Sequence, residues 1–495
     1  MHFHFFFLWF GTLVTLNRAA PNALSNRDIT FEVCAPTRSV NLVNVAPIGI
    51  SFEFFTFPDY IREVPSTSEC MKNLADALGS PIPSRIGGTT ADFGQYDAEL
   101  CDAIDYELTE DDEEVPKQLT FGPEYIRLAS TLPGSVILGL NRKSNNLNNT
   151  LEAAKEAINT MDNLHAIEVG NEPEYWGKSA PIAEDKPWTF EENVASELKW
   201  QEAISTSLGR KDIVQAGNYL GHFRISELAK HEGNSTGFIK SFGIHSYPQN
   251  TCGKSKTNLT ILMAHRSIVE YMNRFKPDIE EAAKLNKPAY FSETNSVACG
   301  GGPVSPSFGA ALWTLDYIIQ SLLAGIKHLY FHHGTLGESR YSFWGRFDLG
   351  SPYYGVYFAA MALRGIDGIS MLDDGLGLDA AYLLTSKSEP VRILLYNSRY
   401  RSAIESRQPH SKVKMTIDLA NTKIANHHTA QIFRLQASSS EARVDRGQSP
   451  TISGIQFENG TCQKKEGITE PEYVNVVDGK LQVLVEDSEA VLIQL

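Results

Sequence analysis

The sequence predicts an α/β protein in which a (β/α)8 barrel, or TIM barrel, is joined to a C-terminal antiparallel β-sandwich. Three observations predict this fold class. Between residues 44 and 335, short apolar runs alternate with longer segments of helical periodicity, as expected for βα units around a parallel sheet. After Gly365, short β-branched runs separated by turn residues replace this pattern. The segment has no Gly-rich phosphate fingerprint, which would favour an open doubly wound sheet.

Eight apolar runs are the candidate barrel strands, and this number favours a closed barrel. They are Val45–Glu53, Ser84–Gly87, Val136–Leu140, Ala166–Val169, Ile213–Ala216, Phe242–His245, Ala289–Glu293 and Lys327–His332. Amphipathic helices are predicted after several of these runs. They span Ser66–Leu78, Leu151–Met161, Phe190–Leu208, Leu262–Asn286 and Phe308–Ala324.

The second domain is predicted from short strands near the C-terminus. These are Ala381–Thr385, Val391–Tyr396, Lys412–Leu419, His428–Leu435, Val474–Val477 and Lys480–Leu495. An early run over Asp28–Val33 precedes the barrel and is assigned to the same domain. We therefore place the barrel at residues 44–364 and the sandwich at residues 28–43 plus 365–495, a division that suits a chain of 495 residues.

Composition and charge exclude some functional classes. Apolar residues make up 42% of the chain and charged residues 21%, which indicates a globular protein with a sizeable core. The formal net charge is -15, and no run of basic residues is present. Because phosphate binding draws on clustered Lys and Arg, we expect no nucleic acid partner.

The N-terminus predicts secretion. Phe5–Leu16 is an apolar stretch followed by a polar segment and Ala19-Ala20, which is typical of a signal peptide over residues 1–20 and too short for a membrane span. No later run is long enough to cross a bilayer, so no membrane anchor is predicted. Four glycosylation sequons lie in polar sequence that reads as loop, at Asn148, Asn234, Asn258 and Asn459. We expect a secreted, extracellular glycoprotein.

Six cysteines are spread over the chain, and their spacing matches no metal-binding pattern. An even number in an oxidising compartment suggests up to three disulfides, with buried free thiols as the alternative. Cys252 and Cys299 follow the sixth and seventh strands, so a bridge between them on one rim of the barrel is predicted. We also predict that Cys34 pairs with Cys462, which leaves Cys70 and Cys101 for a third bridge.

Two glutamates close barrel strands, where reactive groups of this fold lie. Glu172 follows the fourth strand within Gly170-Asn171-Glu172-Pro173, and Glu293 ends the seventh within Phe291-Ser292-Glu293-Thr294. Cleavage of a glycosidic bond with retention needs two carboxyl groups about 5 to 5.5 Å apart across the bond. We predict Glu172 and Glu293 as this pair of catalytic carboxyl groups.

These motifs resemble the acid/base and nucleophile motifs of clan A glycoside hydrolases, and specifically of glycoside hydrolase family 79, which holds β-glucuronidases and heparanase. The resemblance implies Glu172 as the general acid/base and Glu293 as the nucleophile. The resemblance covers nearly the whole chain. Further matching stretches are Arg85 to Phe93 after the second strand, Gly139 to Asn141, His245 to Tyr247 and Tyr341 to Tyr354. The resemblance implies a β-glucuronide, or a glycan bearing glucuronic acid, as the substrate.

Cys299-Gly300-Gly301-Gly302 is the most discriminating of these features. The resemblance implies that backbone N–H groups of Gly300 and Gly301, with the hydroxyl of Tyr341, bind the sugar carboxylate. Glycines let the main chain approach an anion closely, and successive amides form a concave anion site. The sequence departs from heparanase by one extra residue before this loop and by Cys299 in place of a Tyr.

Other site residues have supporting roles. We expect Asn171 to bind the sugar 2-hydroxyl and Tyr247 to contact the nucleophile, with His245 beside it. Arg85 either keeps Glu293 ionised or pairs with the interior Glu168. Residues that match substrate-binding positions of the family are Glu53, Thr89 and Asn141. No cofactor is expected, and no metal is assigned to His332-His333, because adjacent strand residues point to opposite faces.

The expected activity is exo-acting hydrolysis of a terminal β-linked glucuronic acid, which is 4-O-methylated in some substrates. An endo-β-glucuronidase of the heparanase kind is the first alternative, but a sulfated chain calls for Lys and Arg clusters that this sequence lacks. An exo-glycosidase for a neutral sugar is disfavoured by the glycine loop and Tyr341. A non-catalytic carbohydrate-binding protein on the same scaffold is disfavoured by the presence of both Glu172 and Glu293.

Overall fold

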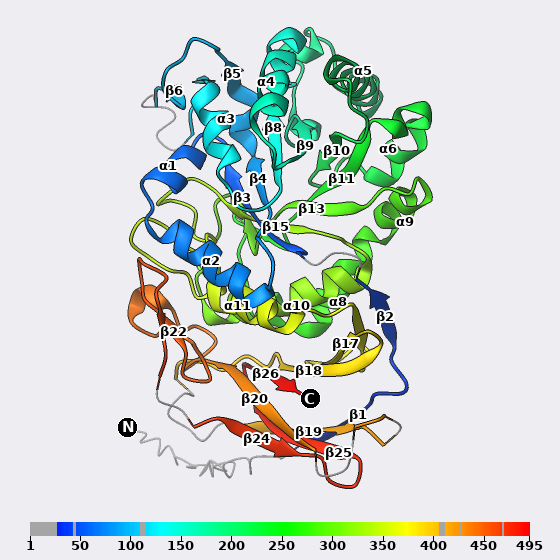
Figure 1. Cartoon of the computed structure of the whole chain (residues 1–495), viewed down its shortest axis with the longest axis vertical. Helices are drawn as coiled ribbons and strands as arrows, with labels where there is room; N and C mark the ends of the chain where they lie inside the picture. The colour runs from blue at the N-terminus through cyan, green and yellow to red at the C-terminus, as the bar shows by residue number, and fades with distance from the viewer. Residues whose placement is uncertain are drawn as a thin grey trace, which may run out of the picture.

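The computed structural model describes residues 27–42, 46–108, 115–404, 411–420, 422–424, 428–467 and 470–495. The predicted signal peptide, residues 1–20, lies outside them. Figure 1 shows the barrel above and the C-terminal domain below, with helices α10 (Phe308–Ala324) and α11 (Pro352–Leu363) between them. The predicted fold class is confirmed: a closed parallel barrel with helices and a C-terminal domain of mainly antiparallel sheets.

Eight parallel strands close the barrel, and each corresponds to one predicted apolar run. They are β3 (Ile48–Glu53), β4 (Ser84–Gly87), β8 (Val136–Leu140), β9 (Leu164–Val169), β10 (Val214–Tyr219), β11 (Ile239–Ser246), β13 (Ala289–Thr294) and β15 (Leu329–His333). The ring closes where β15 pairs with β3, with Leu329 opposite Ile48. Continuous apolar runs are typical of parallel strands that are buried on both faces.

Helices cover the outside of the barrel. Three have the predicted bounds, namely α2 (Ser66–Leu78), α5 (Phe190–Leu208) and α10. The others are α1 (Phe57–Arg62), α3 (Pro123–Ser130), α4 (Leu147–Thr160), α6 (Ile225–His231), α7 (Leu259–Met263), α8 (His265–Met272) and α9 (Lys276–Lys284). The single helix predicted over Leu262–Asn286 is therefore wrong. Ala264 is extended and separates α7 from α8, and Pro277 in the first turn of α9 favours a new helix start there.

The C-terminal domain has two sheets. One contains β1 (Arg27–Glu32), β19 (Lys412–Asp418) and β25 (Lys480–Glu486). The other runs β2 (Arg38–Asn41), β16 (Gly368–Met371), β17 (Asp379–Ser386), β18 (Glu389–Asn397), β26 (Glu489–Gln494), β20 (Thr429–Gln436) and β21 (Thr451–Ile452), with β24 (Glu472–Asn475) also paired to β20. The predicted run Lys480–Leu495 is two strands rather than one, since the chain turns at Ser488, which has a positive φ, and passes from β25 in the first sheet to β26 in the second. The pairing of β1 with β19 is parallel.

Several loops contain short paired strands. Between β4 and β8 lie β5 (Gly94–Tyr96), β6 (Ile104–Tyr106) and β7 (Leu119–Phe121), which form a small sheet. At the rim, β12 (Gln249–Asn250) pairs with β14 (Val297–Ala298). In the C-terminal domain, β22 (Gln456–Phe457) pairs with β23 (Lys464–Lys465).

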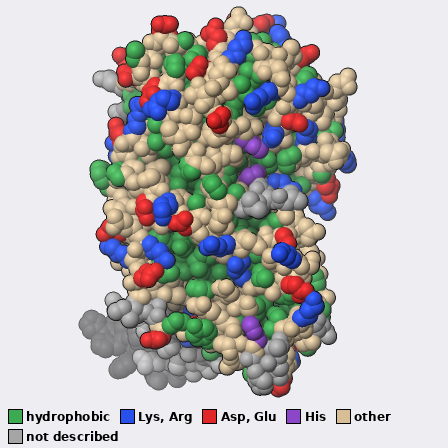
Figure 2. All heavy atoms as spheres, in the orientation of Figure 1, with side chains coloured by type: hydrophobic (Ala, Val, Ile, Leu, Met, Phe, Trp, Pro, Cys, Tyr) green, Lys and Arg blue, Asp and Glu red, His purple; other side chains and the backbone are tan. Residues whose placement is uncertain are grey.

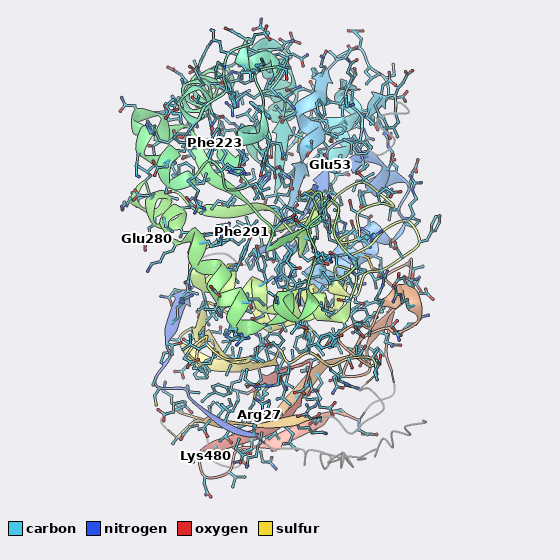
Figure 3. All side chains as sticks on the ribbon, turned by 180° about the vertical axis from the view of Figure 1, so that it is seen from behind. Arg27, Glu53, Phe223, Glu280, Phe291 and Lys480 are labelled. Atoms are coloured by element: carbon cyan, nitrogen blue, oxygen red, sulfur yellow. A yellow bond between two sulfur atoms is a disulfide. The ribbon has the colours of Figure 1, made fainter. Side chains whose placement is uncertain are left out.

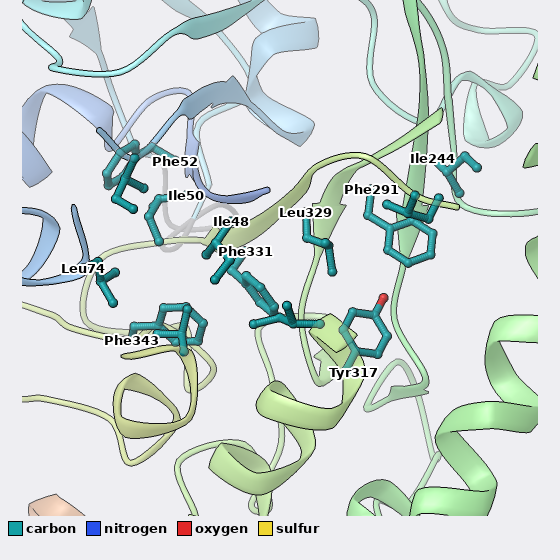
Figure 4. Packing of buried hydrophobic residues seen from close by; sticks show 14 of the residues in the cluster. Ile48, Ile50, Phe52, Leu74, Ile244, Phe291, Tyr317, Leu329, Phe331 and Phe343 are labelled. Atoms are coloured by element: carbon teal, nitrogen blue, oxygen red, sulfur yellow. The ribbon is translucent and has the colours of Figure 1, made fainter. Parts of the chain in front are cut away.

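Side chains on the outer face of the barrel strands are apolar, whereas those that face the barrel interior include polar groups. Ile48, Ile50 and Phe52 alternate along β3 and pack outward in the core shown in Figure 4. The intervening positions Ser51 and Glu53 face the interior, because successive strand residues point to opposite faces. In Figure 3, Glu53 lies at the barrel, whereas Arg27 and Lys480 lie in the C-terminal domain. The barrel interior therefore supplies polar groups to the end where the strands terminate.

The structure contains two disulfides. Cys252 is bonded to Cys299, as predicted. The predicted pairing of Cys34 with Cys462 is wrong, because Cys462 is bonded to Cys70 of α2 and joins the barrel to the C-terminal domain. The predicted third bridge between Cys70 and Cys101 is therefore also wrong, and Cys101 is an exposed free thiol.

The four sequon asparagines are exposed, but not all lie in loops. Asn148 lies in the first turn of α4, and Asn258 caps the start of α7 by accepting from the N–H of Ile261. The face in Figure 2 carries acidic and basic side chains interspersed with apolar ones. Within the described ranges, no helix has the length and apolar character to span a membrane.

Candidate active site

A cleft of about 930 Å³ opens where the barrel strands end. Its walls bring together many of the predicted site residues: Glu53, Thr89, Glu172, Tyr247, Glu293, Gly300, Gly301 and Tyr341. These side chains come from the ends of β3, β4, β9, β11, β13 and β15 or from the loops that follow them. Such a convergence at the carboxyl ends of the strands is where this fold builds its active sites.

Glu293 lies at the end of β13 and is buried, with 6% of its surface exposed. Tyr247 donates its hydroxyl to Oε1 at 2.7 Å, and Arg85 Nη1 donates to Oε2 at 2.6 Å. Burial alone would raise the pKa of Glu293, but the positive charges of His332, His245 and Arg85 and the hydrogen bond from Tyr247 together lower it far below its usual range. Glu293 is therefore an ionised carboxylate at neutral pH, as a nucleophile must be.

Arg85 serves both of the roles that its sequence position suggested. It is fully buried and pairs with Glu168 through Nε and Nη2, while Nη1 binds Glu293. Nη2 also donates to Asn171 Oδ1 at 3.1 Å. One guanidinium thus compensates two buried carboxylates, whose charges would otherwise carry a large desolvation penalty.

Glu172 stands on a sharp turn after β9. Its backbone is left-handed, with φ 44°, and its N–H donates to the carbonyl of Asn218 at 3.1 Å. His245 Nδ1 lies 2.9 Å from Glu172 Oε1. Burial would lower the pKa of His245, but Glu293 and Glu172 raise it overall. With 19% of its side chain exposed, Glu172 is the more accessible of the two glutamates.

The two glutamates face each other closely. One oxygen of Glu172 and one of Glu293 lie within 4.8 Å of each other and of a nitrogen of His245. A close approach of this kind is compatible with double displacement, for which the carboxyl groups are about 5 to 5.5 Å apart. Arg85 binds Glu293, and His245 is hydrogen-bonded to Glu172.

The loop after β13 has an unusual backbone conformation. Cys299, Gly300 and Gly301 have φ values of 61°, 74° and 89°, so three successive residues are left-handed. The carbonyl of Gly300 accepts from the N–H of Arg340 at 2.8 Å, and Thr251 Oγ1 donates to the carbonyl of Gly301 at 3.1 Å. Within the described part of the chain, the N–H groups of Gly300 and Gly301 donate to no protein acceptor. They are available to an anion in the cleft.

Tyr341 packs against this loop. A side chain at Gly301 would place its Cβ only 3.0 Å from the backbone nitrogen of Tyr341, so a glycine is needed for this approach. The phenol is buried, with 5% exposure, and burial raises its pKa well above the usual value. The Tyr341 hydroxyl therefore stays protonated and can donate to an anion.

A second polar cluster in the cleft contains Glu53 and His332. Glu53 accepts from the N–H and Oγ1 of Thr90 at 2.9 and 2.5 Å, and its other oxygen lies 3.1 Å from His332 Nε2. His332 Nδ1 is also 3.9 Å from Glu293. Sequence reasoning missed His332 as a site residue. Its position at the inward-facing end of the eighth run carries the signal that could have found it.

The two asparagines predicted to bind substrate differ in position. Asn171 lies beside the catalytic pair, since its N–H donates to Asp92 Oδ1 at 3.1 Å and its side chain accepts from Arg85. Asn141 does not belong to the cleft wall. Its amide group is engaged with the carbonyl of Gly94 and the N–H of Ser144, each at 3.0 Å, so it stabilises a loop instead.

Comparisons with known proteins agree with this geometry. Residues 380–492 match the family described as the glycosyl hydrolase family 79 C-terminal beta domain. The chain is 26% identical to a β-glucuronidase of Aspergillus niger over 90% of each chain, and 29% identical to a β-glucuronidase of Neurospora crassa over 68% of this chain and 66% of that one.

Solved structures extend the likeness to the whole fold. A 4-O-α-L-rhamnosyl-β-D-glucuronidase from Fusarium oxysporum, crystallised with Rha-GlcA, is 41% identical over 94% of this chain and all of its own, with a TM-score of 0.89. A β-xylosidase from Caulobacter crescentus is 13% identical over 94% of this chain and 99% of its own, with a TM-score of 0.57, and shares the fold alone.

Proposed function

Since the chain belongs to glycoside hydrolase family 79 and is a β-glucuronidase, we propose that it releases terminal β-linked glucuronic acid by retaining exo-hydrolysis. Glu293 is the nucleophile and Glu172 the general acid/base. The observation that carries this proposal is the pairing of the two glutamates within 4.8 Å, in a cleft that Gly300 and Gly301 also line.

The reaction has two displacements. Glu293 attacks C1 of the glucuronic acid while Glu172 gives its proton to the glycosidic oxygen, so the C1–O bond breaks and the aglycone leaves as an alcohol. This step forms a glucuronyl ester on Glu293. Glu172, now a carboxylate, takes a proton from water, and the water oxygen attacks C1 and returns Glu293 to its free form. The product keeps the β configuration.

Neighbouring groups support each step. Arg85 and Tyr247 keep Glu293 ionised before attack, and His245 orients Glu172 through the 2.9 Å hydrogen bond. Asn171 is fixed by Arg85 and Asp92 near the pair, where it binds the sugar 2-hydroxyl as the oxocarbenium-like transition state forms.

Specificity for the uronate comes from the loop after β13. The N–H groups of Gly300 and Gly301 and the hydroxyl of Tyr341 bind the carboxylate, while Glu53 and Thr89 bind sugar hydroxyls on the opposite wall. Short-range donors matter here because the protein has a net charge of -15 and exerts no long-range attraction on an anion. Arg340 is the one Lys or Arg among the described residues that line the cleft, which disfavours endo action on a sulfated chain.

A substituent on O4 of the glucuronic acid defines a second candidate substrate, the 4-O-rhamnosyl-β-glucuronide. The 41% identity to a 4-O-α-L-rhamnosyl-β-D-glucuronidase favours it, as does the size of the cleft, about 930 Å³. Thr89 and Val115 line the same cleft as Glu53. A 4-O-methyl group fits the same space.

Secretion is part of the proposal. The apolar N-terminal stretch, the four exposed sequons and the two disulfides support export to an oxidising compartment. N-terminal sequencing of protein recovered from the culture medium tests it, with a mature chain that starts near Pro21 as the expected result.

The activity is tested with three synthetic substrates that share one leaving group: the β-glucuronide, the 4-O-rhamnosyl-β-glucuronide and the β-glucoside. Both uronides are expected to be cleaved far faster than the glucoside, and NMR of the first product should show the β anomer. A preferred glucoside would contradict the uronate assignment, and an α first product would contradict double displacement.

A further inference from the structure

An exposed tyrosine stands beside the proposed acid/base at the edge of the cleft. Tyr175 is the last residue of the 3-10 helix η2 (Pro173–Tyr175), and its N–H donates to the carbonyl of Glu172 at 3.0 Å. It lines the cleft together with Glu172 and is 55% exposed, although its neighbours Pro173 and Trp176 are buried. The ring is thus presented to any molecule bound next to Glu172.

The Tyr175 ring is held in place by the loop that follows β10. Glu174 Oε1 accepts from the N–H groups of Leu220 and Gly221 at 2.7 and 3.0 Å, which ties this loop to η2. His222 on the same loop contacts the Tyr175 ring edge to face, with the ring centroids 5.5 Å apart. Leu220 also lines the cleft. Tyr175 and Leu220 therefore form one wall at this end.

The turn that carries Glu172 and Tyr175 is held in place by Trp176. Trp176 donates its indole N–H to Asp92 Oδ2 at 2.8 Å, packs against Trp188 at 5.6 Å between ring centroids, and lies under the guanidinium of Arg142. Because Tyr175 is already held in place before binding, its side chain loses little conformational entropy when a ligand binds.

The general acid in a glycosidase protonates the oxygen of the leaving group, so side chains around it contact the aglycone. We propose that Tyr175 and Leu220 form the aglycone subsite, in which the Tyr175 ring stacks on the apolar C–H face of a sugar next to the scissile bond. This inference rests on the proposed role of Glu172. It deepens the proposed function by naming the class of leaving group.

The charges at this end indicate a neutral sugar. Glu172 and Glu174 are the acidic groups next to Tyr175, and Arg340, the one Lys or Arg among the described cleft-lining residues, is bound through its N–H to Gly300 on the uronate side. A sulfated or carboxylated aglycone would find no Lys or Arg among the described cleft-lining residues near Tyr175. A neutral hexose such as galactose offers an apolar face and no charge.

The test compares wild type with Tyr175→Ala and Tyr175→Phe on three substrates: β-glucuronyl fluoride, glucuronic acid β-linked to galactose, and the same disaccharide sulfated on the galactose. The fluoride has no aglycone ring. Loss of the Tyr175 ring is expected to lower kcat/KM on the neutral disaccharide about 3- to 10-fold, as for an aromatic contact of this kind, and to leave the fluoride within twofold. Tyr175→Phe should retain most of the activity, and the sulfated substrate should be the poorest for wild type.

Tyr473→Ala is the matched control, since Tyr473 is similarly exposed, at 58%, but lies on β24 of the C-terminal domain. Tyr473→Ala should leave the ratios of kcat/KM among the three substrates as they are in wild type. Equal losses on fluoride and disaccharide would overturn the inference, because Tyr175 would then only support the turn of Glu172. An unchanged disaccharide rate, or a preference for the sulfated substrate, would overturn it as well. If the wild-type enzyme were inactive on the fluoride, the result would contradict the proposed function, and therefore also the inference that rests on it.

Discussion

Arg85 and Glu293 form a buried ion pair inside the barrel, with Nη1 of the guanidinium 2.6 Å from Oε2 of the carboxylate. The same guanidinium pairs with Glu168, so Glu293, the proposed nucleophile, belongs to an interior network that is complete before substrate arrives. Electrostatic preorganisation of this kind avoids rearrangement during the reaction. We therefore expect substitutions at Glu293, at Glu172 and at their neighbours to change activity, specificity and pH dependence in different ways.

The two glutamates should differ in their dependence on the leaving group. Glu172→Gln removes the proton donor, so activity on a poor leaving group should fall by roughly 10²- to 10⁴-fold, while a substrate that needs little protonation keeps much of its rate. Glu293→Gln removes the nucleophile and should be nearly inactive on every substrate. Steady-state rates on a series of aryl glucuronides check this, and a Glu293 variant with wild-type rate on the best leaving group would reverse the assignment.

Tyr341→Phe should change specificity. The variant loses one charge-assisted hydrogen bond to the uronate, which contributes about 1.5 to 3 kcal/mol, or roughly a 10- to 100-fold loss in kcat/KM on a β-glucuronide. A β-glucoside has no carboxylate, so its rate should hardly change. Equal losses on both substrates would move the carboxylate-binding role away from Tyr341.

Tyr247→Phe should change the pH dependence instead. The Tyr247 hydroxyl lowers the pKa of Glu293 through the 2.7 Å hydrogen bond, so its removal raises that pKa. Activity needs ionised Glu293 and is lost as the pH falls through its pKa, so the acid limb of kcat/KM should move to higher pH. At neutral pH, kcat/KM on the glucuronide and kcat/KM on the glucoside should fall by the same factor. An unshifted acid limb would assign Tyr247 to the substrate rather than to the nucleophile.

The two disulfides should have different roles. The double variant Cys252→Ala/Cys299→Ala frees the loop that carries Gly300 and Gly301, and the ratio of glucuronide to glucoside activity should fall several-fold. The matched variant Cys70→Ala/Cys462→Ala unties α2 from the C-terminal domain and should lose about 2 to 5 kcal/mol of stability with the ratio unchanged. Thermal unfolding and paired assays separate the two effects, and an unchanged ratio in the first variant would show that the loop holds its shape alone.

A buried histidine links the two domains. His265 at the start of α8 lies 2.8 Å from Asp316 of α10 and 2.9 Å from Asp373, which follows β16. Burial would lower the pKa of His265, but the two carboxylates raise it to about 10. His265→Ala should cost about 3 to 5 kcal/mol near neutral pH, because it leaves buried carboxylates without a partner.

This contribution has a defined pH window. The pKa of His265 is raised on folding, so its stabilisation is complete below about 6.5 and is lost as the pH rises through about 10. The difference in Tm between wild type and His265→Ala should therefore be largest near pH 6 and shrink toward pH 11. A difference that stays constant over this range would mean that the loss comes from packing rather than from charge.

Much of the barrel was accessible from sequence because its strands are buried on both faces and read as apolar runs. The same pattern located Glu172 and Glu293, since a polar residue that closes such a run lies at the open end of the barrel. His332 obeys the same rule at the end of the eighth run. We missed it because the pair His332-His333 was considered only as a metal motif.

Features that depend on distant segments were not accessible in this way. The bridge between Cys70 and Cys462 depends on the docking of α2 against the C-terminal domain, across a separation of 392 residues. The interruption at Ala264 carries no glycine or proline at the break itself, so helical periodicity continues through it. Asn141 matched a family position, but its amide is engaged by the loop around Gly94 and Ser144.

The pairing of β1 with β19 constrains how the protein is made. Arg27 lies opposite Val413, so the first described strand of the chain finds its parallel neighbour only after the whole barrel has been translated. At about 5 to 20 residues per second, the delay is on the order of 20 to 80 s. During this time Asp28 and Glu32, both exposed on β1, discourage pairing with other chains. A ribosome that stops before β19 therefore leaves β1 as an unpaired edge, however well the barrel has folded.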